Sequence, residues 1–227
     1  MTRLDMNKSG LLLGAATLLW CWWPLPSHAA AETKSALETD GVGWIDIQPA
    51  SGLSGWTLVP IPPTNSLGRA QWHVSQSGVL VCDGDGGHDM LRFNEELADG
   101  IFHVEFCYAP VTGTNRNYNS GVFIRNSADG TIWHQAQLTM KGGYLFGNSP
   151  TNGLNQRFKT SPTDSRMKPA GEWNTIEVMA RGKKLSVWLN GAETCVWDHC
   201  EVPKGFIALE AEGYRIEFRH LRYKRLD

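Results

Sequence analysis

The chain has 227 residues, of which 41% are hydrophobic and 19% are charged, and its formal net charge at pH 7 is −2. No basic run stands out, which excludes nucleic acid and an anionic membrane surface as electrostatic partners. The roughly two hundred residues that follow the N-terminal segment suit one single-core domain, which we expect to be a monomer.

The N-terminal residues 1–30 have the pattern of a secretory signal peptide. Arg3 and Lys8 precede an apolar run over residues 11–23 that is too short to span a bilayer comfortably. Small residues then suit cleavage after Ala29 or Ala31. A lipid anchor at Cys21 is disfavoured, because Trp20 before it is too bulky for lipoprotein processing. We therefore expect a secreted or periplasmic protein with no further transmembrane span, residues 31–43 as a polar linker, and a domain over residues 44–227.

Short alternating runs fill the rest of the chain, each bounded by Gly, Asn, Asp or Pro. No stretch after the signal shows a sustained helical period. Many strands at this spacing predict an all-β fold, a two-sheet β-sandwich or jelly roll. The runs cover residues 72–82, 101–110, 120–126, 133–139, 175–182, 184–197, 205–213 and 216–226.

One segment, residues 144–173, has almost no strand pattern and is rich in Asn, Ser, Thr, Pro and Gly. A structureless loop of this length is usually functional or mobile. Its basic residues, among them Arg157 and Lys168, suit a polar or anionic ligand.

Four cysteines follow the predicted cleavage site, and an even count in an exported protein is compatible with two disulfides. Cys195 and Cys200 are close enough in the sequence to pair, and Cys82 and Cys107 lie on neighbouring predicted strands. Free buried thiols are the alternative.

Alternation along three predicted strands gathers polar side chains on one sheet face. Val122 and Ile124 share one face, so Arg125 points the other way. Gln135 and Gln137 likewise oppose Ala136 and Leu138, and Glu210 and Glu212 oppose Ile207 and Leu209. If the three polar faces coincide, two carboxylates, two amides and a guanidinium line one groove. Solvated or structural ion pairs are the alternative for the charged members.

The motif series "NSGVFIR", "QAQL", "KPAGEWNTIEVMARGKKLSVWLNG" and "IALEAEGYRIEFRHLRYKRL" closely resembles the 3-keto-disaccharide hydrolase domain family over residues 44–226. The resemblance implies a concanavalin A-like jelly roll that is exported and cleaves glycosides oxidised to a ketone at C3. It implies a carbohydrate substrate bound on the concave sheet.

Such chemistry needs a base near C2, a stabiliser of the ketone oxygen and an acid for the leaving oxygen. We predict Glu212, Glu210 and His134 as the catalytic candidates, although alternation also allows His134 a structural role. The sequence requires no cofactor, but a divalent cation such as Ca²⁺ could stabilise the oxyanion, and the turn that holds His88, Asp83, Asp85 and Asp89 is a weak pointer to one. The predicted substrate-binding residues are Asn119, Arg125, Trp133, Gln135, Gln137, Arg157 and Lys168.

One departure from the family pattern bears on activity. The strand after the Asn-Ser-Gly motif usually carries Glu-x-Gln in the family, whereas this chain has Gln135-Ala136-Gln137. An amide cannot act as a general base. We therefore expect an enzyme whose base lies elsewhere, with a non-catalytic glycan-binding module as the alternative.

Overall fold

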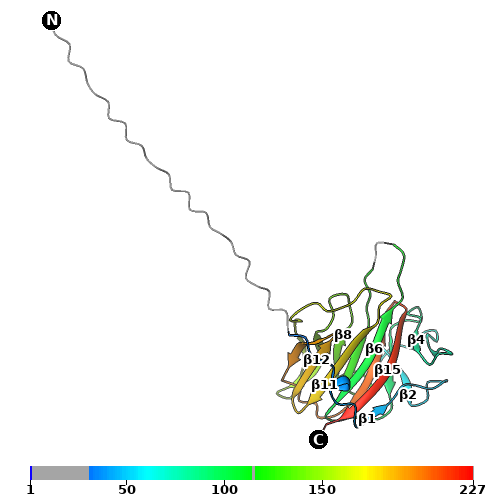
Figure 1. The fold of residues 1–227 in the computed structure, drawn as a ribbon. Coiled ribbons are helices and arrows are strands. Elements are labelled where there is room, and N and C mark those ends of the chain that lie inside the picture. The colour runs from blue at the N-terminus through cyan, green and yellow to red at the C-terminus, as the bar shows by residue number, and fades with distance from the viewer. Residues whose placement is uncertain (2–30, 114–115, 227) are drawn as a thin grey trace.

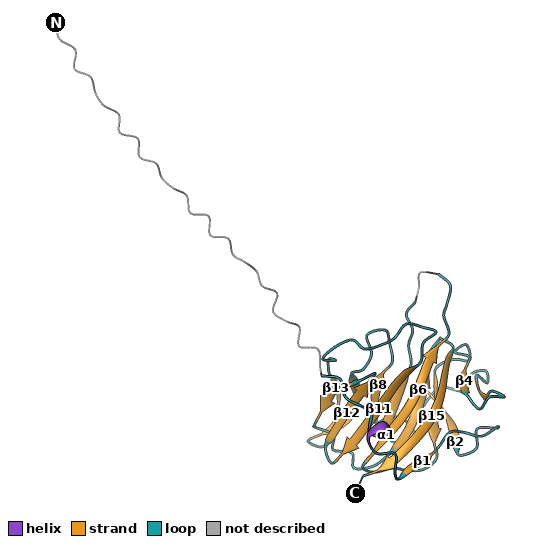
Figure 2. Cartoon of the chain, in the orientation of Figure 1, coloured by secondary structure: helices purple, strands orange, loops and turns teal. Residues whose placement is uncertain are grey.

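Two antiparallel β-sheets stacked face to face form the fold (Figures 1 and 2). The computed structural model describes residue 1, residues 31–113 and residues 116–226. Apart from its first residue, the predicted signal peptide, including Cys21, lies outside the described residues. No helix in the described ranges is long and apolar enough to cross a membrane.

The larger sheet has eight strands: β1 (Trp44–Asp46), β3 (Trp72–Val74), β4 (Leu80–Cys82), β6 (Gly100–Tyr108), β11 (Asn174–Arg181), β12 (Lys184–Leu189), β13 (Ala192–Trp197) and β15 (Ile216–Arg225). They run in the order β13-β12-β11-β6-β15-β4-β3, with β1 beside β15. The first and last parts of the domain therefore lie side by side in this sheet.

The second sheet has seven strands: β2 (Trp56–Pro60), β5 (Asp89–Phe93), β7 (Gly121–Asn126), β8 (Trp133–Gln137), β9 (Leu145–Thr151), β10 (Leu154–Lys159) and β14 (Phe206–Ala211). Their order is β10-β9-β8-β7-β14-β5-β2. The pairing of β7 with β14, far apart in sequence, requires a crossover of the kind that jelly rolls contain. The predicted all-β two-sheet fold is confirmed.

The core fills the space between the two sheets and follows the predicted alternation. Val122 and Ile124 of β7 pack there with Leu209 of β14 and with Phe102 and Val104 of β6. Full burial of each such side chain contributes about 1.5–3 kcal/mol. On β7, β8 and β14, the residues that alternate with core residues must then point away from the core, onto the outer face of the seven-stranded sheet.

The prediction that residues 144–173 lack strands is wrong for the first half of that segment. Residues 145–159 form the hairpin β9–β10 at the edge of the seven-stranded sheet. Its turn holds Asn152 and Gly153 at φ values of 52° and 76°, the left-handed conformations of a type I′ hairpin turn. Asn-Gly is the strongest short-range signal for such a turn, although the polar residues around it show no alternation.

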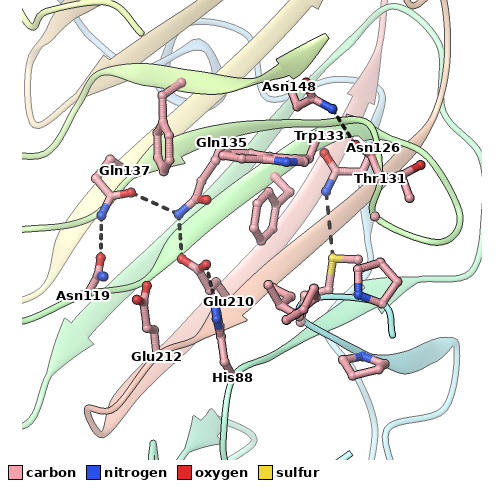
Figure 3. Close-up of a pocket in the computed structure, with 18 of the residues that line it drawn as sticks. His88, Asn119, Asn126, Thr131, Trp133, Gln135, Gln137, Asn148, Glu210 and Glu212 are labelled. Atoms are coloured by element: carbon pink, nitrogen blue, oxygen red, sulfur yellow. Dashed lines mark hydrogen bonds and ion pairs between the residues drawn. The ribbon is translucent and has the colours of Figure 1, made fainter. Parts of the chain in front are cut away.

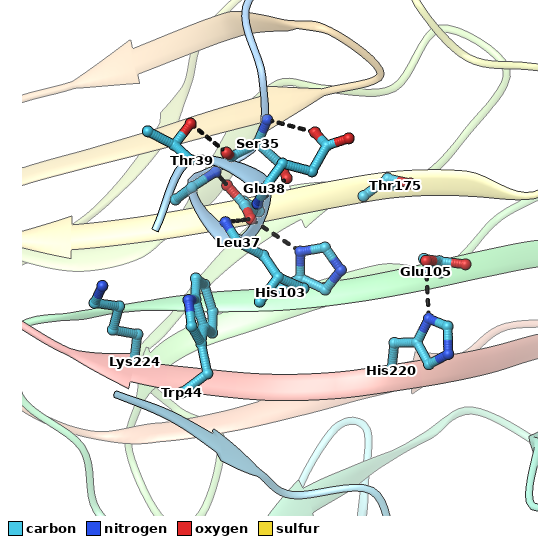
Figure 4. A network of polar contacts seen from close by, with 12 residues as sticks. Ser35, Leu37, Glu38, Thr39, Trp44, His103, Glu105, Thr175, His220 and Lys224 are labelled. Carbon is cyan, nitrogen blue, oxygen red and sulfur yellow. Dashed lines mark hydrogen bonds and ion pairs between the residues drawn. The ribbon is translucent and has the colours of Figure 1, made fainter. Parts of the chain in front are cut away.

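The segment expected as a linker, residues 31–43, contains helix α1 (Ala36–Thr39), which lies on the outer face of the larger sheet. Glu177 of β11 accepts hydrogen bonds from the backbone N–H groups of Ala36 (2.6 Å) and Leu37 (3.1 Å). The same carboxylate lies 2.9 Å from Nδ1 of His103, and Figure 4 shows His103 beside Leu37 of the helix. This network is on the side of the sandwich opposite to the outer face of the seven-stranded sheet.

The two disulfides that the cysteine count allowed are not formed, because all four described cysteines are free and buried. Cys82 of β4 and Cys107 of β6 are separated in the sheet by β15. Sγ of Cys195 lies 2.8 Å from the hydroxyl of Thr160, whereas Cys200 contacts Arg125. The alternative, free buried thiols, is confirmed for these four cysteines.

Candidate functional site

A pocket of about 540 Å³ opens on the outer face of the seven-stranded sheet (Figure 3). This volume falls in the range of roughly 300–1,000 Å³ that is typical of small-molecule sites. One end, called the acid end below, is polar and consists of His88, Asn119, Gln135, Gln137, Glu210 and Glu212. The apolar side chains of the lining, called the apolar end below, are those of Pro60, Ile61, Pro62, Pro63, Met90, Phe123, Trp133 and Phe146, of which Phe123 and Phe146 pair with Gln135 across the neighbouring strands.

Glu210 is the most tightly held member of the acid end. Its backbone lies on β14 between the core residues Leu209 and Ala211, so its side chain must point to the outer face. One carboxylate oxygen, Oε1, lies 2.9 Å from Nε2 of His88. The other, Oε2, accepts a hydrogen bond of 2.6 Å from Nε2 of Gln135. With both oxygens engaged and only 4% of the residue exposed, Glu210 is suited to orient its neighbours.

Gly121 makes the contact between Gln135 and Glu210 possible. The strands β8 and β14 flank β7 in the sheet, so Gln135 must reach across β7 to meet Glu210. A Cβ at position 121 would lie only 2.1 Å from Nε2 and 2.4 Å from Cδ of Gln135. The glycine of the Asn-Ser-Gly motif therefore leaves the space through which the amide passes.

A chain of amides extends the acid end away from Glu210. Nε2 of Gln135 also donates to Oε1 of Gln137 at 3.0 Å, and Nε2 of Gln137 donates to Oδ1 of Asn119. Figure 3 shows these side chains in a row on one side of Glu210. Such a fixed row of donors and acceptors matches the hydroxyl groups of a sugar ring.

The pKa values of two groups in the acid end, His88 and Glu212, differ from their ordinary values. The hydrogen bond to Glu210 raises the pKa of His88 above its usual value, which favours the cationic imidazole beside the carboxylate. Burial and then the charge of Glu210 raise the pKa of Glu212. A carboxyl group whose pKa is moved toward neutrality is a better general base or acid at physiological pH.

The acid end also offers a set of metal ligands. One ligand atom each from His88, Glu210 and Glu212 lie within 4.8 Å of one another. An imidazole with two carboxylates suits ions such as Mn²⁺, Fe²⁺ or Zn²⁺ better than Ca²⁺, which takes oxygen ligands.

The neighbouring aspartates that the sequence linked to calcium are engaged elsewhere. Asp89 accepts hydrogen bonds from Nε1 of Trp72 (2.7 Å) and Nε2 of Gln71 (2.8 Å). Asp83 and Asp85 form ion pairs with arginines at the surface. Of the turn residues singled out in the sequence, only His88 lines the pocket.

Arg125 does not face the pocket, and its predicted role in substrate binding is wrong. Between Phe123 and Asn126, β7 carries one more residue than the facing part of β14, which makes a β-bulge, and Arg125 there has a φ of 52°. The bulge turns its side chain inward, where Nη1 donates to the carbonyl oxygens of Gly182 (2.7 Å) and Val202 (2.9 Å).

The guanidinium of Arg125 is also paired with Asp99, and the residue is 1% exposed. Arg125 therefore fastens the two sheets together at one end of the sandwich. Asn126 takes the place on the pocket face that alternation had given to Arg125.

His134 and Lys168 also lie outside the pocket, so their predicted roles are wrong. Nε2 of His134 lies 2.8 Å from Oγ of Ser149, and Nδ1 lies 3.2 Å from the carbonyl oxygen of Ile124. Burial lowers its pKa to about 4, so it is a neutral structural histidine. Lys168 donates to the carbonyl oxygen of Trp173 at 3.0 Å and lies with His103 on the other side of the molecule.

The pocket brings together most of the residues predicted from the sequence, while their chemical roles remain predictions. Those on its lining are Asn119, Trp133, Gln135, Gln137, Arg157, Glu210 and Glu212. Sequence reasoning missed Phe146, which lies in the overlooked hairpin, and Asn126, which only the bulge brings to this face. It had marked His88 as a possible ligand neighbour without assigning it to the site.

Comparison with protein-family models decides the family. The model of the 3-keto-alpha-glucoside-1,2-lyase-like domain matches residues 43–224. The chain belongs to this family. The resemblance inferred from the motifs is thus confirmed, and the pocket lies within a domain of a carbohydrate-active family. No curated protein sequence matches the chain.

Solved structures with the same fold include two carbohydrate-active proteins from bacilli. The carbohydrate binding module CBM66 from Bacillus subtilis aligns with a TM-score of 0.56 at 14% identity over 78% of this chain and 99% of the module. The β-glucanase of Bacillus licheniformis aligns with a TM-score of 0.55 at 13% identity over 82% of this chain and 100% of the glucanase.

A β-1,3-1,4-glucanase derived from a mouse hindgut metagenome aligns with a TM-score of 0.53 at 13% identity, covering 81% of this chain and 98% of that one. At these identities the likeness concerns the fold, which is the glucanase-type jelly roll.

Proposed function

We propose that the protein cleaves glycosides of 3-keto sugars by elimination followed by addition of water. The observation that carries this proposal is the acid end: a carboxyl group with a raised pKa, Glu212, stands beside the buried carboxylate of Glu210, which is paired with the exposed imidazole of His88, in a pocket of this family's domain. The N-terminal sequence pattern supports a site of action outside the cytoplasm. We expect the domain to act there as a monomer.

In the first step, Glu212 takes the proton from C2 of the sugar. The C3 ketone makes this proton acidic, because the electron pair left on C2 delocalises onto the ketone oxygen as an enolate. The electron pair then returns to form the C1–C2 double bond, and the C1–O bond breaks. The leaving group departs with the bonding electrons and takes up a proton. Water added across the double bond gives the free 3-keto sugar, so the net reaction is hydrolysis.

The other members of the acid end would support this step. Glu210 raises the pKa of His88, and a positive charge on the imidazole would favour the negative charge that develops on the ketone oxygen. The amides of Gln135, Gln137 and Asn119 would hold the sugar hydroxyls and so place C2 near Glu212.

A divalent cation is the other means of stabilising the enolate. His88, Glu210 and Glu212 would hold it, and it would act as a Lewis acid on the ketone oxygen. In that case Glu212 would be a ligand and the base would have to be another group or a bound water.

A non-catalytic glycan-binding module is the second candidate function. The observation that favours it is Gln135, an amide at a position where a general base would need a carboxylate, with its Nε2 engaged by Glu210 and Gln137. Such a module would hold the intact sugar on the same row of amides.

The test is to incubate the purified domain with a methyl 3-keto-α-glucoside and with the same glucoside unoxidised, each with and without EDTA. The proposal predicts release of methanol from the ketone only, because the unoxidised sugar has no acidic proton at C2. If EDTA stops the release of methanol and Mn²⁺ or Zn²⁺ restores it, the acid end binds a divalent cation. Binding of both sugars with no release from either would contradict the proposal and favour the binding module.

A further inference from the structure

The apolar end of the pocket contains side chains that do not belong to the main core. Met90, Phe123 and Ala208 form a buried hydrophobic cluster separate from the main core, with Val59, Ile61 and Trp133 packed against it. The exposed face of an antiparallel sheet is normally polar. The three cluster residues are at most 3% exposed, so the apolar surface offered to the pocket comes mainly from the partly buried Ile61 and Trp133 that pack on them.

Aromatic rings form the wall above this cluster. Trp133 meets Phe146 edge to face at a centroid distance of 5.0 Å and Phe123 at 6.3 Å. The guanidinium of Arg157 lies 4.9 Å from the centroid of the Trp133 ring. Trp133 is thereby held in a fixed orientation at the border between the two ends, as Figure 3 shows beside Gln135.

Two amide side chains that line the pocket outside the acid end, Asn126 and Asn148, bind other groups of the protein. Oδ1 of Asn126 accepts a hydrogen bond from the backbone of His134 (3.0 Å), and its Nδ2 is directed to Sδ of Met90 (3.9 Å). Nδ2 of Asn148 donates to the carbonyl oxygen of Thr131 at 2.9 Å. A second sugar ring there would therefore find fewer hydroxyl partners than the amide row of the acid end provides.

We propose that the apolar end receives an aromatic leaving group, so that the substrates are 3-keto-glucosides of phenols. This inference rests on the proposed function: with the keto sugar in the acid end, the C1 substituent extends toward Trp133. A planar ring there would pack against the wall of aromatic side chains and cover the apolar cluster.

The charge at this end fits the same chemistry. Among the described lining residues outside the acid end, Arg157 carries the only ionisable side chain. A phenol has a pKa near 10, like tyrosine, whereas an alcohol resembles water, with a pKa of about 15.7. A phenolate can thus leave without an acid at its oxygen, and the positive charge of Arg157 favours its departure.

The first arm of the test measures binding without turnover. Calorimetry compares 4-nitrophenyl α-glucoside with methyl α-glucoside, neither of which has the C3 ketone. We expect the aryl glucoside to bind at least about tenfold more tightly, and this ratio to fall to about threefold or less in Trp133→Leu and in Phe146→Leu. Trp188→Leu is the matched control, because Trp188 lies on β12 and donates to Thr33 on the far side, and it should keep the full ratio.

The second arm measures release from the 3-keto forms of both glucosides and from a 3-keto disaccharide. We expect the highest kcat/KM for the aryl substrate and a loss of this preference in the Trp133 variant. Equal binding of aryl and methyl glucosides, or a preference for the disaccharide, would overturn the inference even if all substrates are cleaved. Selective binding of the aryl glucoside with no release from any 3-keto substrate would contradict the proposed function. The apolar end would then still be a binding site for an aromatic group.

Discussion

Gln135 donates a hydrogen bond of 2.6 Å to Glu210 across the strand that separates them. The two residues lie on β8 and β14, and β7 passes between them with Gly121 at the crossing point. Since His88 is bound to the other oxygen of Glu210, the geometry of the imidazole also depends on this contact. A glycine, an amide, a carboxylate and an imidazole thus act as one unit.

Gly121→Ala should disrupt this unit. The added methyl would overlap the side chain of Gln135, which must then leave Glu210. We expect kcat/KM for a 3-keto-glucoside to fall by about tenfold or more while the circular dichroism spectrum is retained. Gly41→Ala, at an exposed position without a positive φ where the nearest atom to an added Cβ is the carbonyl oxygen of Leu37 at 3.8 Å, is the control and should keep its activity. Equal activities in wild type and Gly121→Ala would contradict the dependence on this contact.

Arg125→Leu should lower stability and leave sugar binding intact. The variant leaves the carbonyl groups of Gly182 and Val202 without their donor and removes the partner of Asp99. We expect the free energy of unfolding in urea to fall by about 2–4 kcal/mol. Arg157→Leu, at an exposed position, should change it by less than about 0.5 kcal/mol. Weakened sugar binding at unchanged stability in Arg125→Leu would restore the role predicted from the sequence.

His134 makes stability depend on pH. Burial lowers its pKa in the folded protein to about 4 from an ordinary value of 6.5. Below pH 6.5 the unfolded chain therefore binds a proton that the folded chain does not, so stability is complete above that value and falls as the pH drops toward 4. Between pH 8 and pH 5 the loss from this residue is about 2 kcal/mol. Urea titrations at several pH values should show this loss of unfolding free energy in wild type and not in His134→Gln. If the free energy of unfolding depends on pH in the same way in both proteins, His134 is not its cause.

The pH profile of kcat/KM should be bell-shaped. Activity rises as Glu212 loses its proton, at a pH above the ordinary carboxyl range because its pKa is raised. Activity falls as His88 loses its proton, at a pH above the ordinary histidine range because Glu210 raises its pKa. In Glu210→Gln the falling limb should move to lower pH, since the imidazole has lost its carboxylate. A falling limb that stays in place would show that His88 does not produce it.

Alternation in the sequence was sufficient to predict the two-sheet fold and the convergence of Glu210, Glu212, Gln135 and Gln137 on one face. Each of these residues lies in or directly after a regular strand, next to aliphatic residues whose burial fixes the direction of the polar side chain. The motifs identified the family for the same reason, since they mark strand positions and turns.

The failures occurred where a local irregularity or a buried polar contact overrides alternation. One inserted residue in β7 sends Arg125 into the interior and Asn126 to the pocket. His134 is polar by type, yet the hydroxyl of Ser149 and a carbonyl oxygen satisfy it inside the protein. His88 reaches Glu210 from 122 residues away in the sequence, a distance over which no periodicity argument applies.

The most direct test of the central claim is turnover of a 3-keto-α-glucoside by Glu212→Gln beside wild type. Glu217→Gln is the matched control, because Glu217 lies on β15 of the other sheet, next to Arg215. The account predicts a loss of about 10²–10⁴ in kcat for Glu212→Gln with substrate binding retained, and full activity in the control. Turnover by Glu212→Gln within about threefold of wild type, far short of the loss expected for a general base, would show that Glu212 does not take the C2 proton.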